Sequence, residues 1–530
     1  MFLFSMAAKN KKFKKFIELS FNSKEEKDNF NEQWNGFRKK RPDLSTIVQV
    51  MYYFLSLAVK CTDIGNEAVP DANFHYNSFV NITKEQSKCE RLFVTCESSI
   101  NSLVGAVYSL GQRCHFSRTA IVTRLEDFAN FVATFTISNG KHTFLWKSSP
   151  YIEGWSKFFV NEKMSCGVVC SGLMYTPFTR FLNATTLGST NERVYNETCN
   201  RLSTIISNEA KASKERAIQN SLAGSGASGI TMETDACFSA FRNAKRSITF
   251  GLCNETHTVL ADKVKSTNHD DSSVQRHETI ATKEILNDFK QEGIKVRCIV
   301  HDSNNSVSKV VKDDFPEVKE QKDVWHVIKN VMSSFKKISK GTKKTENICW
   351  HGQLFDKYDG IKNHIWYSIM HSGNDETLLR DSLDAIVSHY QGYHESCRLT
   401  SHCVRNPRYA PSRVLLTDPI AIDLLSKFVH DTSIYKNPHL VLEGLSTSYV
   451  EAANNALRSF LPKRHSFGDT SFQVRVDLFI LHWNENVNRP FKRAVVPQNE
   501  GTPRENSGRK YQSKKTFQYL EKIWISYLEA

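Results

Sequence analysis

The sequence lacks several features that would place it in a membrane or outside the cell. No apolar run of its 530 residues approaches the roughly 20 residues that a membrane-spanning helix needs. Residues 1–8 are too short, and wrongly flanked, for a signal peptide. The 13 cysteines are an odd number scattered along the chain, which does not make a disulfide framework. We therefore expect a reduced compartment, cytosol or nucleus, and no membrane partner.

Residues 61–155 lack the closely spaced ligand pairs of a zinc ribbon. Cys89, Cys96 and Cys114-His115 offer suitable side chains, but no Cys-x-x-Cys or Cys-x-x-His pair is present. Apolar, β-branched runs at 90–95 and 131–137 are typical of strands. We predict a small β-rich domain here, with a degenerate zinc ribbon as the metal-binding alternative.

Positive charge gathers at the two ends of the chain, whose net charge is +14. Residues 1–60 carry 12 Lys and Arg against 6 acids, and residues 487–530 carry 9 against 4, so +3 is left for everything between. A basic segment 1–60 and a basic tail 491–530 on a near-neutral body favour a polyanion partner, nucleic acid first. Tails that only aid solubility are the alternative. The basic run Arg38-Lys-Lys-Arg41 is a weak indication of nuclear import.

Residues 156–222 have the pattern of a helical subdomain. The sequence Ser189-Thr-Asn-Glu192 resembles a capping box at the start of a helix that runs towards residue 220. Such helices suit either a helix-turn-helix DNA reader or a plain helical subdomain. The small residues 221–229 predict a linker and a domain boundary.

After this linker, the order of elements predicts an α/β fold with a mixed sheet. Strands are expected at 230–235, 247–252, 256–261 and 296–302, a further strand before Asp323, and helices at 273–292 and 307–315. Three strands, a helix, a strand, a helix and a strand is the ribonuclease H-like arrangement, which we assign to 230–346. In it the first and fourth strands are neighbours, so Asp235 and Asp302 would share one edge of the sheet. Alternatively, Asp302 only caps the next helix.

Basic and metal-binding side chains follow in the next segments. Six lysines after Asp323 would suit a DNA backbone or form a solvated helix face: Lys329, Lys336, Lys337, Lys340, Lys343 and Lys344. Residues 347–445 predict an all-helical insertion, with helices near 362–370, 376–390 and 420–430. Within it, His389, His394, Cys397 and Cys403 match the ligand set of a structural Zn²⁺ site, although His402 could replace one of them. An ordinary loop rich in His and Cys is equally compatible.

A third acid completes a candidate catalytic set. Residues 446–490 predict two further helices, at 446–461 and 473–483, and Glu451 lies next to the apolar stripe of the first. Asp235, Asp302 and Glu451 would repel one another unless a hard cation joined them, which indicates Mg²⁺ or Mn²⁺. Two such ions would activate a water or a 3′-hydroxyl against a phosphodiester.

These residues resemble the eukaryotic DDE transposases with a ribonuclease H-like core and a Cys/Asp-x-x-His motif, the Kolobok group first, with hAT, P and Mutator relatives further off. The resemblance covers about residues 155–490. It rests on Thr231-Met-Glu-Thr-Asp-Ala, Val300-His-Asp-Ser, Lys322-Asp-Val-Trp-His-Val and Tyr449-Val-Glu-Ala-Ala-Asn-Asn, with support from Pro462-Lys-Arg-His-Ser-Phe and His482-Trp-Asn-Glu-Asn-Val-Asn-Arg489. The zinc-domain spacing with which Kolobok chains often begin is missing, and so is a Gly/Pro-rich segment after Asp235.

The resemblance implies a function and roles for particular residues. Asp235, Asp302 and Glu451 would bind the metal, Asp323 and His326 would be the accessory motif, and residues 347–445 the insertion before the last acid. The implied activity is cut-and-paste transposition on double-stranded DNA by a nuclear homo-oligomer. The alternative is a domesticated DNA-binding protein that has lost catalysis, and a related nuclease would cut without joining strands.

Overall fold

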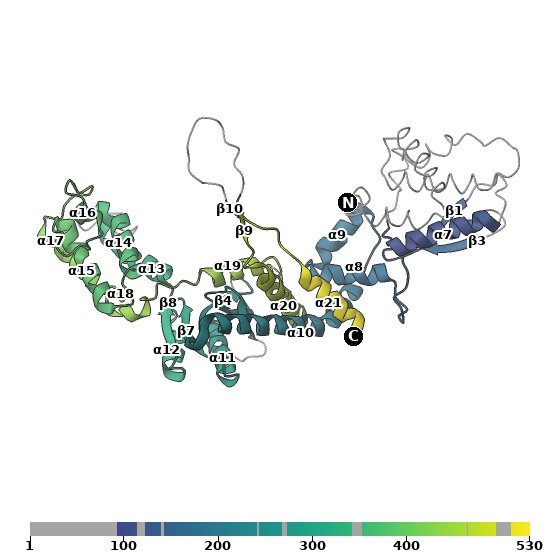
Figure 1. Cartoon of the computed structure of the whole chain (residues 1–530), viewed down its shortest axis with the longest axis horizontal. Coiled ribbons are helices and arrows are strands. Elements are labelled where there is room, and N and C mark those ends of the chain that lie inside the picture. Colours follow the sequence, from purple (N-terminus) through teal and green to yellow (C-terminus); the bar gives the residue numbers. More distant parts are fainter. Residues whose placement is uncertain are drawn as a thin grey trace, which may run out of the picture. The chain divides into compact units, whose positions relative to one another are not determined.

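The computed structural model describes residues 93–113, 122–138, 143–240, 243–267, 273–341, 352–463, 465–493 and 510–530 (Figure 1). They fall into two compact units. The first runs to Val168 and includes Met174–Tyr195, and the second comprises Val169–Leu173 and Asn196–Ala530.

The first unit contains a three-stranded antiparallel sheet. Its strands are β1 (Val122–Ala129), β2 (Val132–Ser138) and β3 (Thr143–Lys147), in that order, and helix α7 (Glu97–Arg113) precedes them. The strand predicted at 131–137 is confirmed as β2. The strand predicted at 90–95 is wrong in its described part, because residues 93–96 are irregular. The apolar character of Phe93 serves packing instead, since its ring lies 5.4 Å from that of Phe135. Of the proposed zinc-ribbon ligands, only Cys96 is among the described residues.

The helical prediction for 156–222 is confirmed, with two differences. The helices are α8 (Phe159–Cys170), α9 (Tyr175–Thr185) and α10 (Glu192–Ser225). Asn191, not Ser189, supplies the side chain that accepts a hydrogen bond from the Val194 N–H, at 2.9 Å. The predicted linker is wrong for 221–228, which continues α10 and then forms the short helix η1 (Gly226–Ser228). The hydroxyls of Ser221 and Ser225 donate to helix carbonyls one turn earlier, so these small polar residues fit inside a helix.

The second unit contains a mixed five-stranded sheet of order β6-β5-β4-β7-β8. Its strands are β4 (Ile230–Phe238), β5 (Arg246–Cys253), β6 (Val259–Ser266), β7 (Val296–His301) and β8 (Lys319–Lys322). Strands β4, β5 and β6 pair antiparallel, whereas β4, β7 and β8 pair parallel. The first and fourth strands are neighbours as predicted. This α/β architecture confirms the predicted fold class and is consistent with a ribonuclease H-like core.

The β4–β7 pairing decides where the two aspartates lie. The last paired residues are Glu233 and Val300, and Asp235 and Asp302 each lie two residues further on. Strand β4 nevertheless continues to Phe238 through its pairing with β5, so Asp235 lies within the strand and not at its end, where we had placed it. The strand predicted at 256–261 also begins later, at Val259.

Helices on the sheet close the hydrophobic core of the ribonuclease H-like part. Helix α11 (His277–Gln291), which follows the short helix η2 (Val274–Arg276), and helix α12 (Asn305–Asp314) pack with buried strand residues. The buried side chains at the centre of this core include Ile230, Met232, Ile285, Phe289, Ile299 and Val307. Asn304 caps α12 by accepting from the Ser306 N–H, so Asp302 does not act as the helix cap.

All elements described between residues 352 and 445 are helical, which confirms the predicted helical insertion. They are η4 (Gly352–Lys357), α14 (Tyr358–Met370), α15 (Glu376–Gln391), α16 (His402–Arg405), α17 (Pro419–Asp431), α18 (Ser433–Lys436) and η5 (Pro438–Leu440). Helix α13 (Val324–Ser339) buries its apolar face, from Val324 to Phe335, among these helices. The insertion therefore has its own core, with α13 as part of it (Figure 1).

The chain leaves the insertion along strand β8. The Gln321 side chain donates to the His439 carbonyl at 2.6 Å and accepts from the Glu443 N–H at 3.0 Å. The Val324 N–H donates to the Leu445 carbonyl at 3.1 Å. Residues on either side of the insertion are thereby brought together, and this contact places the helix that follows.

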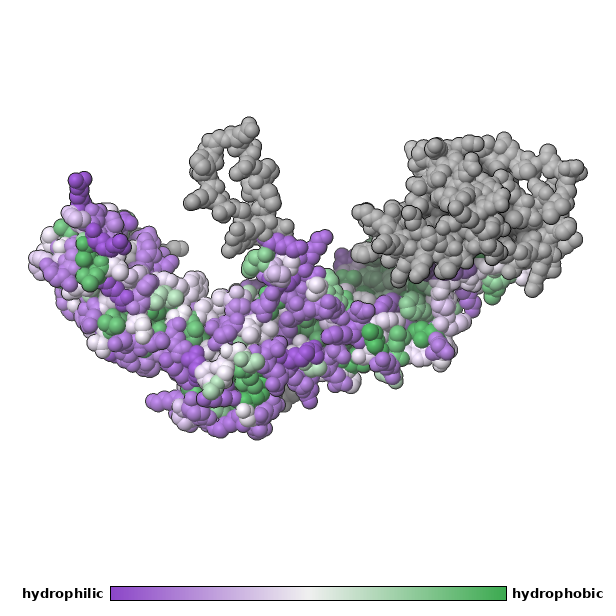
Figure 2. All heavy atoms as spheres, in the orientation of Figure 1, coloured by the Kyte–Doolittle hydropathy of each residue, from purple (hydrophilic) through white to green (hydrophobic). Residues whose placement is uncertain are grey.

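The remaining elements are α19 (Ser448–Leu457), α20 (Asp469–Asn486), β9 (Phe491–Arg493), β10 (Lys510–Gln512) and α21 (Gln518–Glu529). The helix predicted at 446–461 is shorter than expected, and that at 473–483 is longer. Hydrophilic side chains dominate the face drawn in Figure 2. Among the described residues, no helix has the length and apolar content to cross a bilayer.

Candidate active site

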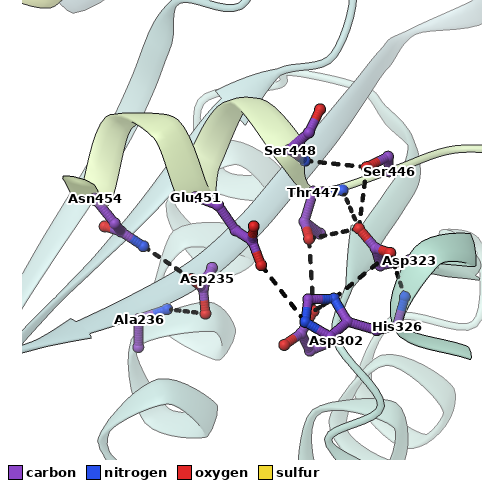
Figure 3. A network of polar contacts seen from close by, with 10 residues as sticks. All are labelled: Asp235, Ala236, Asp302, Asp323, His326, Ser446, Thr447, Ser448, Glu451 and Asn454. Atoms are coloured by element: carbon purple, nitrogen blue, oxygen red, sulfur yellow. Dashed lines mark hydrogen bonds and ion pairs between the residues drawn. The ribbon is translucent and has the colours of Figure 1, made fainter. Parts of the chain in front are cut away.

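The site is built around the buried carboxylate of Asp323, at the end of β8 (Figure 3). Its Oδ1 accepts the His326 N–H at 2.8 Å and so caps α13. Its Oδ2 accepts from the Thr447 N–H at 2.6 Å, the Thr447 hydroxyl at 2.8 Å and the Ser446 hydroxyl at 3.1 Å. Burial would raise the pKa of Asp323, but these donors outweigh it and lower that pKa below its usual value. Both oxygens are engaged within the protein, so Asp323 positions α13 and α19 and is poorly placed to bind an ion as well.

His326 lies between two of the predicted metal ligands. Its Nδ1 is 3.0 Å from Asp302 Oδ1, and its Nε2 is 3.5 Å from Glu451 Oε1. The Nδ1 atom is buried and has no partner in hydrogen-bond geometry, so its approach to Asp302 is a close contact and not an aligned hydrogen bond. The imidazole thus connects the acid after β7 to the acid on α19 (Figure 3).

Asp235 lies beside helix α19 and faces the other acids. Its carboxylate accepts from the Asn454 side-chain amide at 2.9 Å and from the Ala236 N–H at 2.8 Å. Burial first, and then the negative charges of Asp302 and Glu278, raise the pKa of Asp235 to about 7. The Oδ1 atom of Asn454 is buried without a hydrogen-bond partner. Asn454 follows Glu451 by one helical turn, so α19 brings Glu451 and a partner of Asp235 to the same place.

Glu233 is a site residue that the sequence reasoning missed. It is fully buried on β4 and accepts from the Asn254 side chain at 2.7 Å and from the Val450 N–H, in the first turn of α19, at 3.2 Å. Burial raises the pKa of Glu233 to about 7, even though these donors favour the charged form. A signal was available, because Thr231, Glu233 and Asp235 place polar side chains at alternate positions of β4, which share one face of the sheet.

The structure brings the five predicted catalytic residues into one neighbourhood, but not into a finished metal site. Among the described residues, Asp302, Asp323 and His326 form a group whose ligand atoms all lie within 4.8 Å of one another. Asp235, Asp302 and Glu451 do not form such a group. After burial, the negative charge of Asp302 helps to raise the pKa of Asp235, and a divalent cation would relieve that repulsion. The carboxylates and the unpartnered Asn454 oxygen are the hard oxygen ligands that Mg²⁺ prefers.

The predicted DNA-binding lysines begin close to this site. Lys329, Lys336 and Lys337 are exposed on α13, opposite its buried face, and Lys329 lies over the exposed ring of Trp325, at 4.7 Å from the centroid. Lys340 is half-buried beside the Tyr358 ring. Lys343 and Lys344 lie outside the described residues.

The four predicted zinc ligands also come together, away from the acidic edge, in and after α15. His389, His394, Cys397 and Cys403 form a second group with ligand atoms within 4.8 Å of one another. His402, the alternative ligand, is exposed and lies beside Asn406 and Tyr409. The four residues that the sequence singled out therefore lie together, and their role as zinc ligands stays a prediction.

The site therefore combines acids at one edge of an α/β core with a neighbouring helical insertion. Residues 261–403 match the family model of Mutator-like transposases. The match includes Asp302, Asp323 and His326 and supports a transposase family for this chain, with the DNA binding and divalent metal that such a family implies. Asp235 and Glu451 lie outside the matched range. A comparison with curated proteins found no match.

Replacement of Asp323 by Asn should destabilise the protein. The amide would remove the charge that four hydrogen bonds stabilise. Its NH₂ group would replace one accepting oxygen and would then face N–H or O–H donors. We expect a loss of about 2–4 kcal/mol in the free energy of unfolding of the unit that holds it. Urea denaturation measures this loss, and Asp302→Asn, at a half-exposed carboxylate, is the matched control. Equal stability of the two variants would contradict the anchoring role of Asp323.

Replacement of Asp235 by Asn should stabilise the protein in the absence of divalent metal. Because the folded-state pKa of about 7 lies above the ordinary 3.8, the folded protein binds this proton more tightly than the unfolded chain. The carboxyl group therefore contributes stability below about pH 4, and this contribution is lost as the pH rises through 7. The gain in Tm of Asp235→Asn over the wild type should grow between pH 4 and 7 and then level off. The control Asp313→Asn, at an exposed position on α12, should show no such trend. A gain in Tm for Asp235→Asn that does not depend on pH would contradict a raised pKa at Asp235.

Proposed function

We propose that this protein is a DNA transposase that cuts phosphodiester bonds at element ends and joins the freed 3′-hydroxyl to target DNA. One observation carries the proposal: acids from β4, from the end of β7 and from α19 converge at one sheet edge, although 149 residues separate Asp302 from Glu451. The match to Mutator-like transposases, which covers the middle of this arrangement, supports it.

Asp235, Asp302 and Glu451 are the proposed ligands of Mg²⁺ or Mn²⁺. Ions bound there would activate a water or a 3′-hydroxyl and would stabilise the leaving oxygen. Asp302 and Glu451 are half-exposed, as ligands that meet DNA must be, whereas Asp235 lies deeper, under Asn454. His326 holds Asp302 and Glu451 on either side of one ring, and Asp323 fixes His326 through the start of α13. In this assignment Asp323 and Glu233 are positioning residues.

Double-stranded DNA would approach along α13. The exposed Lys329, Lys336 and Lys337 follow His326 on the same helix and would contact phosphates, while the exposed Trp325 offers a ring for stacking on a base. The remainder of the proposal comes from the sequence: a nuclear homo-oligomer related to the eukaryotic Kolobok group. The alternative function is a domesticated DNA-binding protein without catalysis.

Replacement of Asp302 by Asn should abolish metal-dependent DNA cleavage. The variant keeps the shape of the side chain and removes the charge, so a loss of several kcal/mol of transition-state stabilisation corresponds to a rate reduction of about 100-fold or more. The measurement is nicking of supercoiled DNA by the full-length protein with Mg²⁺ or Mn²⁺. Asp313→Asn is the control and should cut normally.

The same assay separates the other functions. Salt-sensitive DNA binding by the wild type without any cleavage would select the domesticated protein, and cleavage without strand transfer would select a nuclease. Cleavage that survives in Asp302→Asn would remove the assignment of the acidic edge as the active site.

Replacement of Lys329, Lys336 and Lys337 together by Gln should weaken DNA binding in a salt-dependent way. Each phosphate contact adds about 0.9 to the slope of log affinity against log salt, so the slope should fall by about 2–3. Lys309, Lys312 and Lys522 are exposed lysines on α12 and α21, and their joint replacement by Gln is a control with the same charge change. An equal effect of the two triple variants would mean that only net charge matters and that α13 is no specific DNA surface.

A further inference from the structure

The loop that follows α15 has almost no hydrophobic packing of its own. None of the residues 391–415 is buried, and the short helix α16 is its only regular element. Loops of this length without internal structure are uncommon in compact domains unless they are functional or held by another device. A segment that cannot form a core needs a staple such as a disulfide or a metal.

Backbone hydrogen bonds fix both ends of the loop to the helical body. At the start, Gly392 ends α15 in the left-handed conformation, and the Tyr393 N–H donates to the Ser388 carbonyl at 3.0 Å. At the end, the Val414 N–H donates to the Asp356 carboxylate at 2.8 Å, and the buried Lys357 ammonium donates to the Val414 carbonyl. Between these anchors lie about 20 residues, including three of the four His and Cys residues that come together.

The spacing of this cluster matches a tetrahedral metal site. Cys397 Sγ lies 3.5 Å from His389 Nδ1 and 3.7 Å from His394 Nδ1. Zinc bonds of about 2.3 Å to sulfur and about 2.0–2.1 Å to nitrogen place such a ligand pair about 3.6 Å apart in a tetrahedron. Cys403 completes the group, whose ligand atoms all lie within 4.8 Å of one another. Both cysteines are free thiols, so no disulfide staples the loop.

Within the insertion, an excess of positive charge is found only in this loop. Residues 392–415 carry 4 Arg and 1 acid, whereas residues 352–391 carry 3 Lys and Arg against 6 acids and residues 416–445 carry 2 Lys against 4 acids. Arg405, Arg408 and Arg413 are exposed, and Arg398 lies 5.6 Å from the centroid of the Tyr367 ring. A basic loop on an acidic helical body is a localised surface for phosphates.

We propose that His389, His394, Cys397 and Cys403 bind one structural Zn²⁺ ion, which orders residues 392–415 as an arginine-bearing surface for the phosphates of double-stranded DNA. The zinc part stands on geometry alone. The DNA part rests on the proposed function in DNA recombination. A closed site with four protein ligands leaves no open position on the ion, so its role is to hold the loop and not to catalyse.

The zinc part is tested by metal analysis of the full-length protein, purified with a reductant and without chelators. The wild type should carry one equivalent of zinc more than Cys397→Ser, Cys403→Ser or His394→Gln. His430→Gln, at an exposed position on α17, and His402→Gln, beside the cluster, should retain the full amount. Unchanged zinc in Cys397→Ser, or a wild type that takes up no zinc at this site, would overturn the proposal.

A second measurement covers the case in which the ligand variants do not fold. Wild-type protein reloaded with Co²⁺ should show the visible absorption of a tetrahedral site with thiolate ligands, which is independent of any variant. An octahedral Co²⁺ spectrum, or a Cys397–Cys403 disulfide that persists in the presence of the reductant, would also overturn the zinc proposal.

The DNA part is tested with Arg405, Arg408 and Arg413 replaced together by Gln. This variant should keep its zinc and lower the salt slope of binding to double-stranded DNA by about 2–3. Replacement of Lys362, Lys427 and Lys436, elsewhere on the insertion, removes the same charge and should change the slope much less. Zinc retention with an unchanged slope would overturn the DNA surface. Zinc content and DNA binding are both measured without cleavage, so failure of the cleavage proposal would be seen separately.

Discussion

The arrangement of the active-site edge depends on the hydrogen bonds that converge on one buried carboxylate, that of Asp323. This side chain receives donors from the start of α13 and from Ser446 and Thr447, more than 120 residues further along the chain. The contact closes the helical insertion and sets the start of α19. A single buried charge, satisfied entirely by the protein, therefore determines where His326, Glu451 and Asn454 lie. The distance of these residues from one another in the sequence matters little once this contact has formed.

The same edge gathers charges that repel one another. Burial, and to a smaller extent the charges of neighbouring acids, raises the pKa of Asp235 and of Glu233 to about 7. A protein that tolerates such repulsion without a cation loses stability that better-placed residues would give. The cost is consistent with a site whose acids are balanced by a bound divalent ion. At the proposed zinc site the ion would have a different role. It would hold together a loop that cannot form a hydrophobic core.

The differences between the sequence predictions and the structure have local physical causes. Residues 221–228 were expected to be a linker because they are small, yet serine hydroxyls that bond helix carbonyls allow α10 to continue. Strand β4 passes beyond Asp235 because its antiparallel partner β5 extends further than its parallel partner β7. Glu233 was missed because its importance lies in a contact with the Val450 N–H, 217 residues away.

The sequence by itself determined the order of strands and helices, the neighbouring positions of the first and fourth strands, the helical insertion and the identity of both clusters of chemically active side chains. The order of elements follows from apolar periodicity, which is local, and the clusters follow from residue types with few other uses in combination. The neighbouring positions of the two strands are what the likeness to the ribonuclease H-like arrangement implies. Only the tertiary structure decided that His326 lies between Asp302 and Glu451, that Asp323 positions these residues, and that α13 packs into the insertion. Such relations depend on the closure of long loops and on which buried polar groups satisfy one another, and no local pattern in the chain records them.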